Sequence, residues 1–91
     1  MSKVICRTDM VIDGKKYQLQ TIDLTSCPFD VDYEQILVPY QKDGSLQKYG
    51  VFKMDTFEDM LSAIEAHNAQ VYRYERGIPL LKYYWGKLIM L

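Results

Sequence analysis

The pair Asp13-Gly14, which lies between two strand-like runs, constrains the fold of this 91-residue chain more than any other feature. Residues 3–12 mix β-branched and polar side chains, and residues 16–24 alternate polar and apolar ones. An Asp-Gly pair favours a type I′ turn, because both central positions of that turn need a positive φ angle. We therefore predict a β-hairpin formed by these two strands.

Two further strands are predicted after this hairpin. Residues 33–38 form the third, which Pro39 ends or confines to an edge because proline has no backbone N–H. The segment Lys42-Asp43-Gly44-Ser45 predicts a turn, and residues 46–54 predict the fourth strand. Consecutive hairpins form an antiparallel meander, and such a sheet needs a covering layer on one face.

A helix over residues 56–76 is predicted to supply that layer. Asp55 or Thr56 can act as the N-cap, since each is followed three positions later by an acidic residue. Gly77 suits the position after the last turn, and Pro79 prevents the helix from continuing. The apolar stripe expected to face the sheet consists of Phe57, Met60, Leu61, Ile64 and Val71. We expect this stripe to meet Val4, Leu19, Ile36, Val38 and Phe52.

Residues 80–91 are almost entirely apolar and aromatic, and periodicity does not distinguish a strand from a short helix in so short a run. Aromatic residues are enriched in strands, so we favour a strand that joins the sheet. The predicted fold is a single α+β domain: an antiparallel meander of three to five strands with one long helix packed on one face. A chain of 91 residues fits one hydrophobic core.

The composition argues against several classes of protein. Hydrophobic residues make up 48% and charged residues 25%, which is typical of globular domains. No apolar run is long enough to cross a membrane, and the N-terminus lacks the apolar core of a signal peptide. Two cysteines, Cys6 and Cys27, are too few for a disulfide scaffold, so we expect a cytoplasmic protein with reduced thiols. Zinc-ligand spacing and phosphate-binding loops are absent, and we expect no metal and no cofactor.

His67 and Cys27 are the residues on which an enzymatic activity would depend. His67 is the only histidine and has no suitably placed companion on its own helix, so we interpret it as a partly buried structural residue. Cys27 lacks a local signature of a catalytic nucleophile, and Cys6 is expected to fill core volume. We therefore predict no catalytic residues and a protein that is not an enzyme.

Charge is distributed unevenly along the chain. Asp30, Asp32 and Glu34 alternate, so in an extended backbone their carboxylates point to one side. The segment lacks the glycine and the distal glutamate of an EF-hand loop, which argues against a calcium site. We therefore interpret these carboxylates as a solvated outward-facing segment or as a contact surface. Residues 21–40 and 55–67 each contain four acids and no base. Such patches attract a basic partner.

The C-terminal quarter of the sequence is instead rich in basic and aromatic residues. Basic residues that alternate with aromatic ones can follow phosphates and stack on bases, but tyrosine, tryptophan and arginine also anchor protein interfaces. A pI of about 5.7 argues against a dedicated nucleic-acid binder. The residues concerned are Arg73, Arg76, Lys82 and Lys87, with Tyr83, Tyr84 and Trp85 among them.

Two segments resemble a pattern found in small uncharacterised bacteriophage and mobile-element accessory proteins. They are Tyr33-Glu34-Gln35-Ile36-Leu37-Val38 and Met54-Asp55-Thr56-Phe57-Glu58-Asp59, followed by His67, which lies about one helical turn later than in that pattern. The resemblance implies a phage or mobile-element origin, and hence the cytoplasm of a host cell. By analogy with compact phage proteins that block host proteins, it also implies an inhibitor role.

These observations predict a non-enzymatic protein-binding module, acting as a small inhibitor of a host defence or nucleic-acid-handling protein. The expected contact residues are Asp30, Asp32, Glu34, Tyr83, Tyr84 and Trp85. Two alternatives stay open. The chain can be a small-ligand or nucleotide-binding homodimer that buries residues 88–91, or a weak single-stranded nucleic-acid binder that uses Arg73, Arg76, Lys82 and Lys87.

Overall fold

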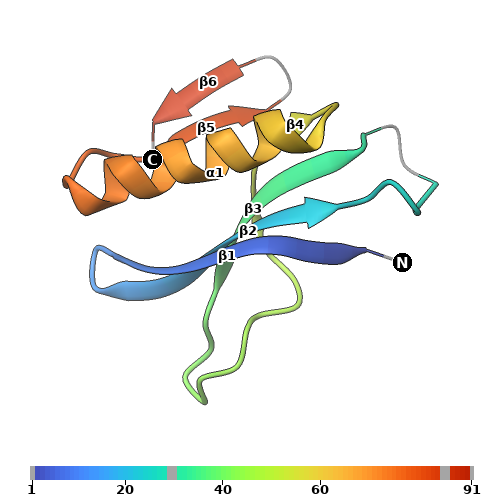
Figure 1. Cartoon of the computed structure of the whole chain (residues 1–91). Helices are drawn as coiled ribbons and strands as arrows, with labels where there is room; N and C mark the ends of the chain where they lie inside the picture. Colours follow the sequence, from blue (N-terminus) through green and yellow to red (C-terminus); the bar gives the residue numbers. More distant parts are fainter. Residues whose placement is uncertain (1, 29–30, 85–86, 91) are drawn as a thin grey trace.

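The computed structural model describes residues 2–28, 31–84 and 87–90. The elements, in chain order, are β1 (Lys3–Ile12), β2 (Lys15–Asp23), β3 (Tyr33–Pro39), β4 (Phe52–Phe57), α1 (Met60–Glu75), β5 (Leu81–Tyr84) and β6 (Lys87–Met90). Strands β1 to β4 form one antiparallel sheet in sequence order, and β5 pairs with β6 in a separate two-stranded sheet. Figure 1 shows α1 lying across the four-stranded sheet, which confirms the predicted α+β meander.

The first hairpin forms as the Asp-Gly pair predicts. Asp13 and Gly14 have φ angles of 52° and 78°, both positive as a type I′ turn requires. The ladder between β1 and β2 runs from Lys3 opposite Asp23 to Ile12 opposite Lys15, with a bulge between Val4 and Cys6. The pairing of β1 with β2 is therefore explained by the sequence of the turn that joins them.

The fourth strand and the helix both begin later in the chain than predicted. Residues 41–51 form a loop, in which the expected turn occurs at Gly44 with a φ of 88°. Strand β4 then extends to Phe57, because Thr56 and Phe57 pair with Glu34 and Tyr33 of β3. The predicted strand over 46–54 is therefore wrong over residues 46–51, and the predicted N-caps are wrong because Asp55 and Thr56 belong to the strand.

Asp59 is the residue that caps α1. Its carboxylate accepts hydrogen bonds from the backbone N–H of Ser62 at 2.8 Å and from the Ser62 hydroxyl at 2.9 Å. At the other end, Arg76 is the C-cap and Gly77 follows with a φ of 69°, as its place in the sequence predicts. The helix is thus four residues shorter at its start than the sequence pattern indicated.

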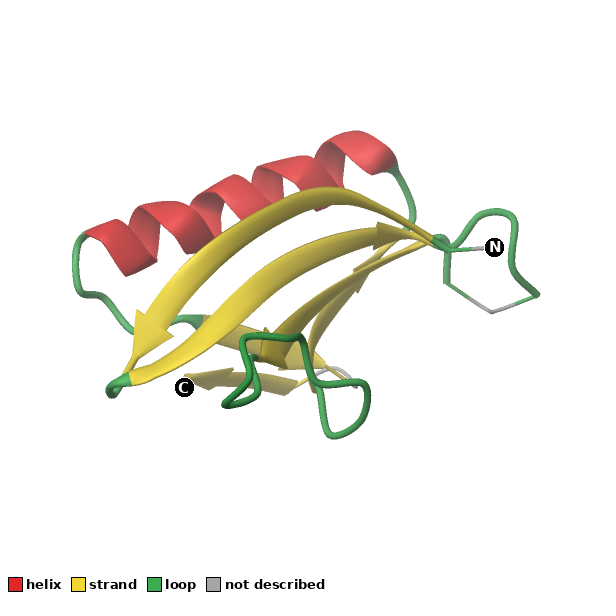
Figure 2. Ribbon diagram, turned by 90° about the horizontal axis from the view of Figure 1, so that it is seen from below, coloured by secondary structure: helices red, strands yellow, loops and turns green. Residues whose placement is uncertain are grey.

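The face that α1 turns toward the sheet matches the predicted apolar stripe only in part: Val71 packs against buried core residues as predicted, but Met60 and Leu61 do not. Ala63, His67 and Gln70 are the buried helix residues, whereas 46% of Met60 and 67% of Leu61 are exposed. In Figure 2 the helix lies along one side of the curved sheet. The prediction fails for Met60 and Leu61 because the sheet beneath α1 offers hydrogen-bonding partners that stabilise His67 and Gln70 in the interior.

The apolar core lies beneath the C-terminal half of α1. It consists of Met10, Leu19, Leu37, Met54 and Leu80, with Ile12, Tyr17, Val71 and Tyr74 packed against it. Ile36 and Val38 are buried, but they alternate with Leu37 and so point to the opposite face of the sheet. Their predicted contact with the helix is therefore wrong.

The end of the chain forms strands, but they pair with each other instead of extending the main sheet. Strand β5 lies beside β4 and forms a hairpin with β6 (Figure 1). The backbone N–H and C=O of Leu81 both bond to the side chain of Gln70, so these groups are not available for a ladder with β4. No helix in the described part of the chain is both long and apolar enough to cross a membrane.

Candidate binding sites

A polar layer fills the space between α1 and the first two strands. His67, whose exposed fraction is only 3%, lies at its centre. Its Nε2 atom is 3.0 Å from the Thr8 hydroxyl, and its Nδ1 atom is 2.9 Å from the Thr21 hydroxyl. Burial lowers the pKa of His67, which favours the neutral ring. A neutral ring has one donor and one acceptor nitrogen, and the two hydroxyls satisfy both.

The layer continues along α1 as a chain of side-chain amides. Nε2 of Gln70 donates to Oε1 of Gln35 at 3.0 Å and also to the backbone carbonyl of Leu81. Oε1 of Gln70 accepts from the backbone N–H of Leu81 at 3.0 Å. Nε2 of Gln35 is buried and, among the described residues, has no hydrogen-bond partner.

An open pocket of about 400 Å³ lies at the end of this amide chain. It is bounded by β3, β4, α1 and β5, and its described lining is Gln35, Asp55, Ala66, Ala69, Gln70, Arg73 and Leu81. The β-bulge of β4, opposite the Gln35–Ile36 step, leaves Met54 in the apolar core and places Asp55 at the pocket. Burial raises the pKa of Asp55, and the backbone N–H of Thr56 bonds its carboxylate at 2.8 Å.

The three predicted acidic contact residues do not form one exposed row. Asp30 lies outside the described residues, and Asp32 is exposed just before β3. Glu34 is buried within β3, and its carboxylate forms an ion pair with the Lys53 ammonium at 3.1 Å. Among these acids, Asp32 is therefore the one that the structure places on the surface.

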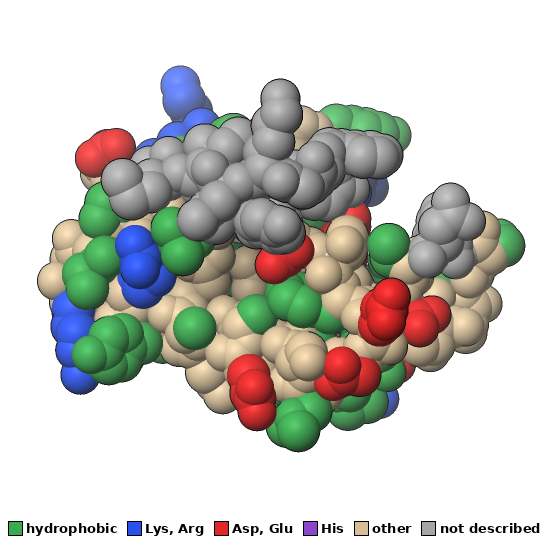
Figure 3. Space-filling view, turned by 90° about the horizontal axis from the view of Figure 1, so that it is seen from above, with side chains coloured by type: hydrophobic (Ala, Val, Ile, Leu, Met, Phe, Trp, Pro, Cys, Tyr) green, Lys and Arg blue, Asp and Glu red, His purple; other side chains and the backbone are tan. Residues whose placement is uncertain are grey.

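Asp32 instead lies next to the beginning of α1. A depression at the surface is lined by Val31, Asp32, Thr56, Phe57 and Glu58. Figure 3 shows most of the acidic side chains gathered toward the right of the view, where α1 begins, and most of the basic ones toward the left. We call the exposed residues Asp32, Glu58, Asp59, Met60 and Leu61 the acidic end of the molecule.

The basic and aromatic residues near the C-terminus are partly engaged within the protein. The Nε atom of Arg73 donates to the backbone carbonyl of Pro79 at 2.7 Å. The Arg76 guanidinium lies 3.6 Å from the centre of the Tyr72 ring, in a cation–π contact. Lys82 is half-buried. The side chains of Tyr83, Tyr84 and Lys87, and the whole of Trp85, lie outside the described part of the structure.

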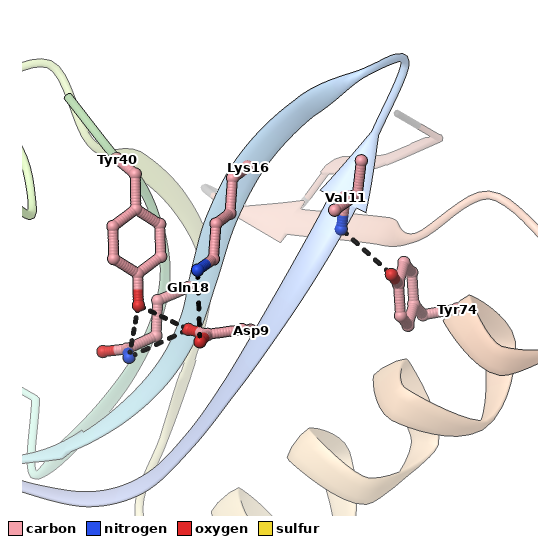
Figure 4. A network of polar contacts seen from close by, with 6 residues as sticks. All are labelled: Asp9, Val11, Lys16, Gln18, Tyr40 and Tyr74. Atoms are coloured by element: carbon pink, nitrogen blue, oxygen red, sulfur yellow. Dashed lines mark hydrogen bonds and ion pairs between the residues drawn. The ribbon is translucent and has the colours of Figure 1, made fainter. Parts of the chain in front are cut away.

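A surface network that sequence reasoning missed joins the first three strands (Figure 4). Oδ1 of Asp9 accepts from the Tyr40 hydroxyl at 2.5 Å and from Nε2 of Gln18 at 3.2 Å. Lys16 adds an ion pair with Asp9 at 3.9 Å, and its ammonium lies 4.6 Å from the centre of the Tyr40 ring. The hydroxyl of Tyr40, then the amide of Gln18, lower the pKa of Asp9. Asp9 lies on β1, Lys16 and Gln18 lie on β2, and Tyr40 follows β3 directly, so only the register of the sheet brings them together.

The outer edge of β1 is tied to the end of α1. The backbone N–H of Val11 donates to the Tyr74 hydroxyl at 3.0 Å (Figure 4). An edge strand presents unpaired N–H groups, and this bond occupies one of them. Tyr74 therefore joins the apolar core on its ring side and the sheet edge at its hydroxyl.

The remaining chemistry-bearing residues are two cysteines and the acidic groups, and they give no metal-binding cluster in the part of the chain that is described. Cys6 and Cys27 are free thiols and half-buried. No group of three or more His, Cys, Asp or Glu residues among the described ones is arranged to hold a metal ion. Comparisons with protein-family models, curated proteins and solved structures found no match for the chain. The function is therefore inferred from the geometry of the acidic end and of the pocket.

Proposed function

We propose that this protein is a non-enzymatic protein-binding module that contacts a basic partner through its acidic end. The observation that carries the proposal is the exposure of Leu61, 67% of which faces solvent on a helix that buries His67 and Gln70. A large apolar side chain that stays in water lacks the stabilisation that burial would give it. A partner that covers Leu61 and Met60 provides that stabilisation.

The charges around these two side chains define the chemistry of the partner. Asp32, Glu58 and Asp59 surround the start of α1, and no lysine or arginine lies between residues 54 and 72 of the sequence. A complementary surface has an apolar recess with a basic rim, which increases the association rate at low ionic strength. Arginine is a common residue in such interfaces because it pairs with carboxylates in a fixed geometry.

We propose further that the partner is a host protein and that binding inhibits it. A basic groove is the surface that nucleic-acid-handling proteins present to phosphates, and an acidic end of this kind competes for such a groove. The resemblance to small phage accessory proteins supports the same role. Asp30, Tyr83, Tyr84 and Trp85 belong to this proposal as further contact residues.

The test is capture from a bacterial lysate with three matched baits: the wild type, Leu61→Lys and Asn68→Lys. Asn68 is an exposed residue of the same helix away from the acidic end, so Asn68→Lys controls for the added charge. The proposal predicts one basic protein, retained near one copy per bait by the wild type and by Asn68→Lys, and lost by Leu61→Lys. Retention should weaken between about 0.05 and about 0.5 M salt, because the acidic end is screened. Equal capture by all three baits, or no capture by the wild type, refutes the proposal.

A further inference from the structure

The amide of Gln35 has a fixed orientation, because the chain of hydrogen bonds that leads to it starts at a backbone. The N–H of Leu81 can bond only an oxygen, so Oε1 of Gln70 must face it, and Nε2 of Gln70 is the atom that bonds the Leu81 carbonyl. The second hydrogen of Nε2 needs another acceptor, which places Oε1 of Gln35 toward it at 3.0 Å. Rotating either amide would bring two donors together. Nε2 of Gln35 therefore has to lie on the side away from Gln70.

Gln35 is only 1% exposed, and no residue that the structure describes provides an acceptor for this donor. An unpaired buried donor is costly, and the large majority of buried side-chain polar atoms in proteins are paired. The neighbouring group is Asp55, which stands directly opposite Gln35 in the β3–β4 register, yet no hydrogen bond joins the two side chains. Cβ atoms of such directly opposed residues are about 5 Å apart.

Gln35 and Asp55 therefore place one donor and one acceptor side by side in the pocket. The pocket volume of about 400 Å³ is within the range of small-molecule sites. Ala66 and Ala69 of α1 form one apolar wall, and Leu81 of β5 forms part of another. A mainly apolar pocket in which a donor lies next to an acceptor matches a ring that carries C=O next to N–H.

We propose that this pocket binds a planar heterocycle with a lactam edge, such as a uracil-type base. Nε2 of Gln35 donates to the ring carbonyl, and the Asp55 carboxylate accepts from the ring N–H. The ligand supplies the acceptor that Gln35 lacks. It also supplies a donor to a carboxylate whose pKa is raised by burial. This site is separate from the acidic end and does not depend on the proposed partner.

The probe pair that tests this inference is uridine and 3-methyluridine. Uridine keeps the ring N–H beside two carbonyls, and methylation removes that N–H while the ring stays planar. A ¹⁵N–¹H correlation spectrum of the whole chain reports the side-chain NH₂ of Gln35 and the backbone amides of Asp55 and Ala69 directly. We expect uridine to shift these signals in a saturable way. We expect 3-methyluridine to bind at least about tenfold more weakly, because the hydrogen bond to the carboxylate is lost.

Two leucine substitutions at neighbouring helix positions provide the matched protein control. Ala69→Leu places a larger side chain in the pocket wall, and Asn68→Leu adds the same side chain at an exposed position outside the lining. Leucine is a good helix former, so both variants should fold. Uridine should fail to shift the Gln35 signal in Ala69→Leu and should bind Asn68→Leu like the wild type. The inference is overturned if uridine causes no saturable shift in the wild type, if 3-methyluridine binds equally well, or if Ala69→Leu retains binding.

Discussion

Replacing Gln70 with leucine is expected to destabilise the fold by about 2 kcal/mol, although leucine is the better residue for a buried helix position. The substitution leaves three groups without their partner: the N–H and C=O of Leu81 and Oε1 of Gln35. Each unsatisfied buried group costs about 1–3 kcal/mol, and the two backbone groups are at the lower limit because Leu81 is only half-buried. Burial of the leucine side chain returns about 1.5–3 kcal/mol. The difference leaves a net loss of about 2 kcal/mol.

The assay is urea unfolding and thermal unfolding, both followed by circular dichroism, with Asn68→Leu as the control. A loss of about 2 kcal/mol lowers the melting temperature of a domain of this size by roughly 8–16 °C. Asn68→Leu adds the same side chain to an exposed position two residues earlier in the helix and should stay within about 0.5 kcal/mol of the wild type. If Gln70→Leu is as stable as the wild type or more stable, the amide chain does not hold α1, β3 and β5 together and the reasoning fails.

Two further predictions concern other polar contacts of the helix. Stability should fall as the pH drops below about 6.5, the ordinary pKa of histidine, because burial lowers the pKa of His67 and only the unfolded chain takes up the proton in that range. Urea titrations at about pH 7.5 and about pH 5.5 measure this loss of stability. The free energy of unfolding of His67→Gln should change less between these two pH values than that of the wild type. An equal change in both proteins would contradict the prediction. Asp59→Ala removes the N-cap and should cost about 1 kcal/mol, or a fall of about 4–8 °C in melting temperature. Glu58→Ala is its control and should change stability by less than about 0.5 kcal/mol; an equal fall in both variants contradicts the assignment of Asp59 as the cap.

The parts of the fold that the sequence predicts are those with local causes. The hairpin at Asp13-Gly14 and the helix end at Gly77 depend on φ angles that few residue types adopt, so both can be recognised from a short segment. The start of the helix has no such local cause. Asp59 caps it only because Thr56 and Phe57 extend the strand by pairing with β3, which lies more than twenty residues earlier.

The orientation of α1 could not be obtained from its own apolar pattern. Met60 and Leu61 have the spacing of core residues, yet His67 and Gln70 are buried because Thr21 and Gln35 of two different strands satisfy their polar atoms. A signal was present in the sequence. Gln35 lies directly before the apolar run Ile36-Leu37-Val38 in the same strand, and a polar residue there indicates a buried partner on another element.

The candidate sites were predicted less well than the fold for the same reason. Asp32 was recognised, but its neighbour Glu58 comes from the start of the helix, and Leu61 was expected in the core. The pocket combines groups from β3, β4, α1 and β5, and the bulge that places Asp55 there leaves no mark in the sequence.

The melting temperature of Leu61→Lys, compared with that of Ala63→Lys, tests most directly the claim that α1 turns Ala63, His67 and Gln70 toward the sheet and Leu61 toward solvent. Ala63 is completely buried against the sheet, and Leu61 is two residues earlier on the exposed side. The account predicts that Leu61→Lys melts within about 4 °C of the wild type, because an exposed lysine needs no desolvation. Ala63→Lys should melt far lower or fail to fold, because it buries an unpaired charge. A large fall for Leu61→Lys together with a tolerated Ala63→Lys would show that the helix faces the other way, and the acidic end would not be the proposed surface.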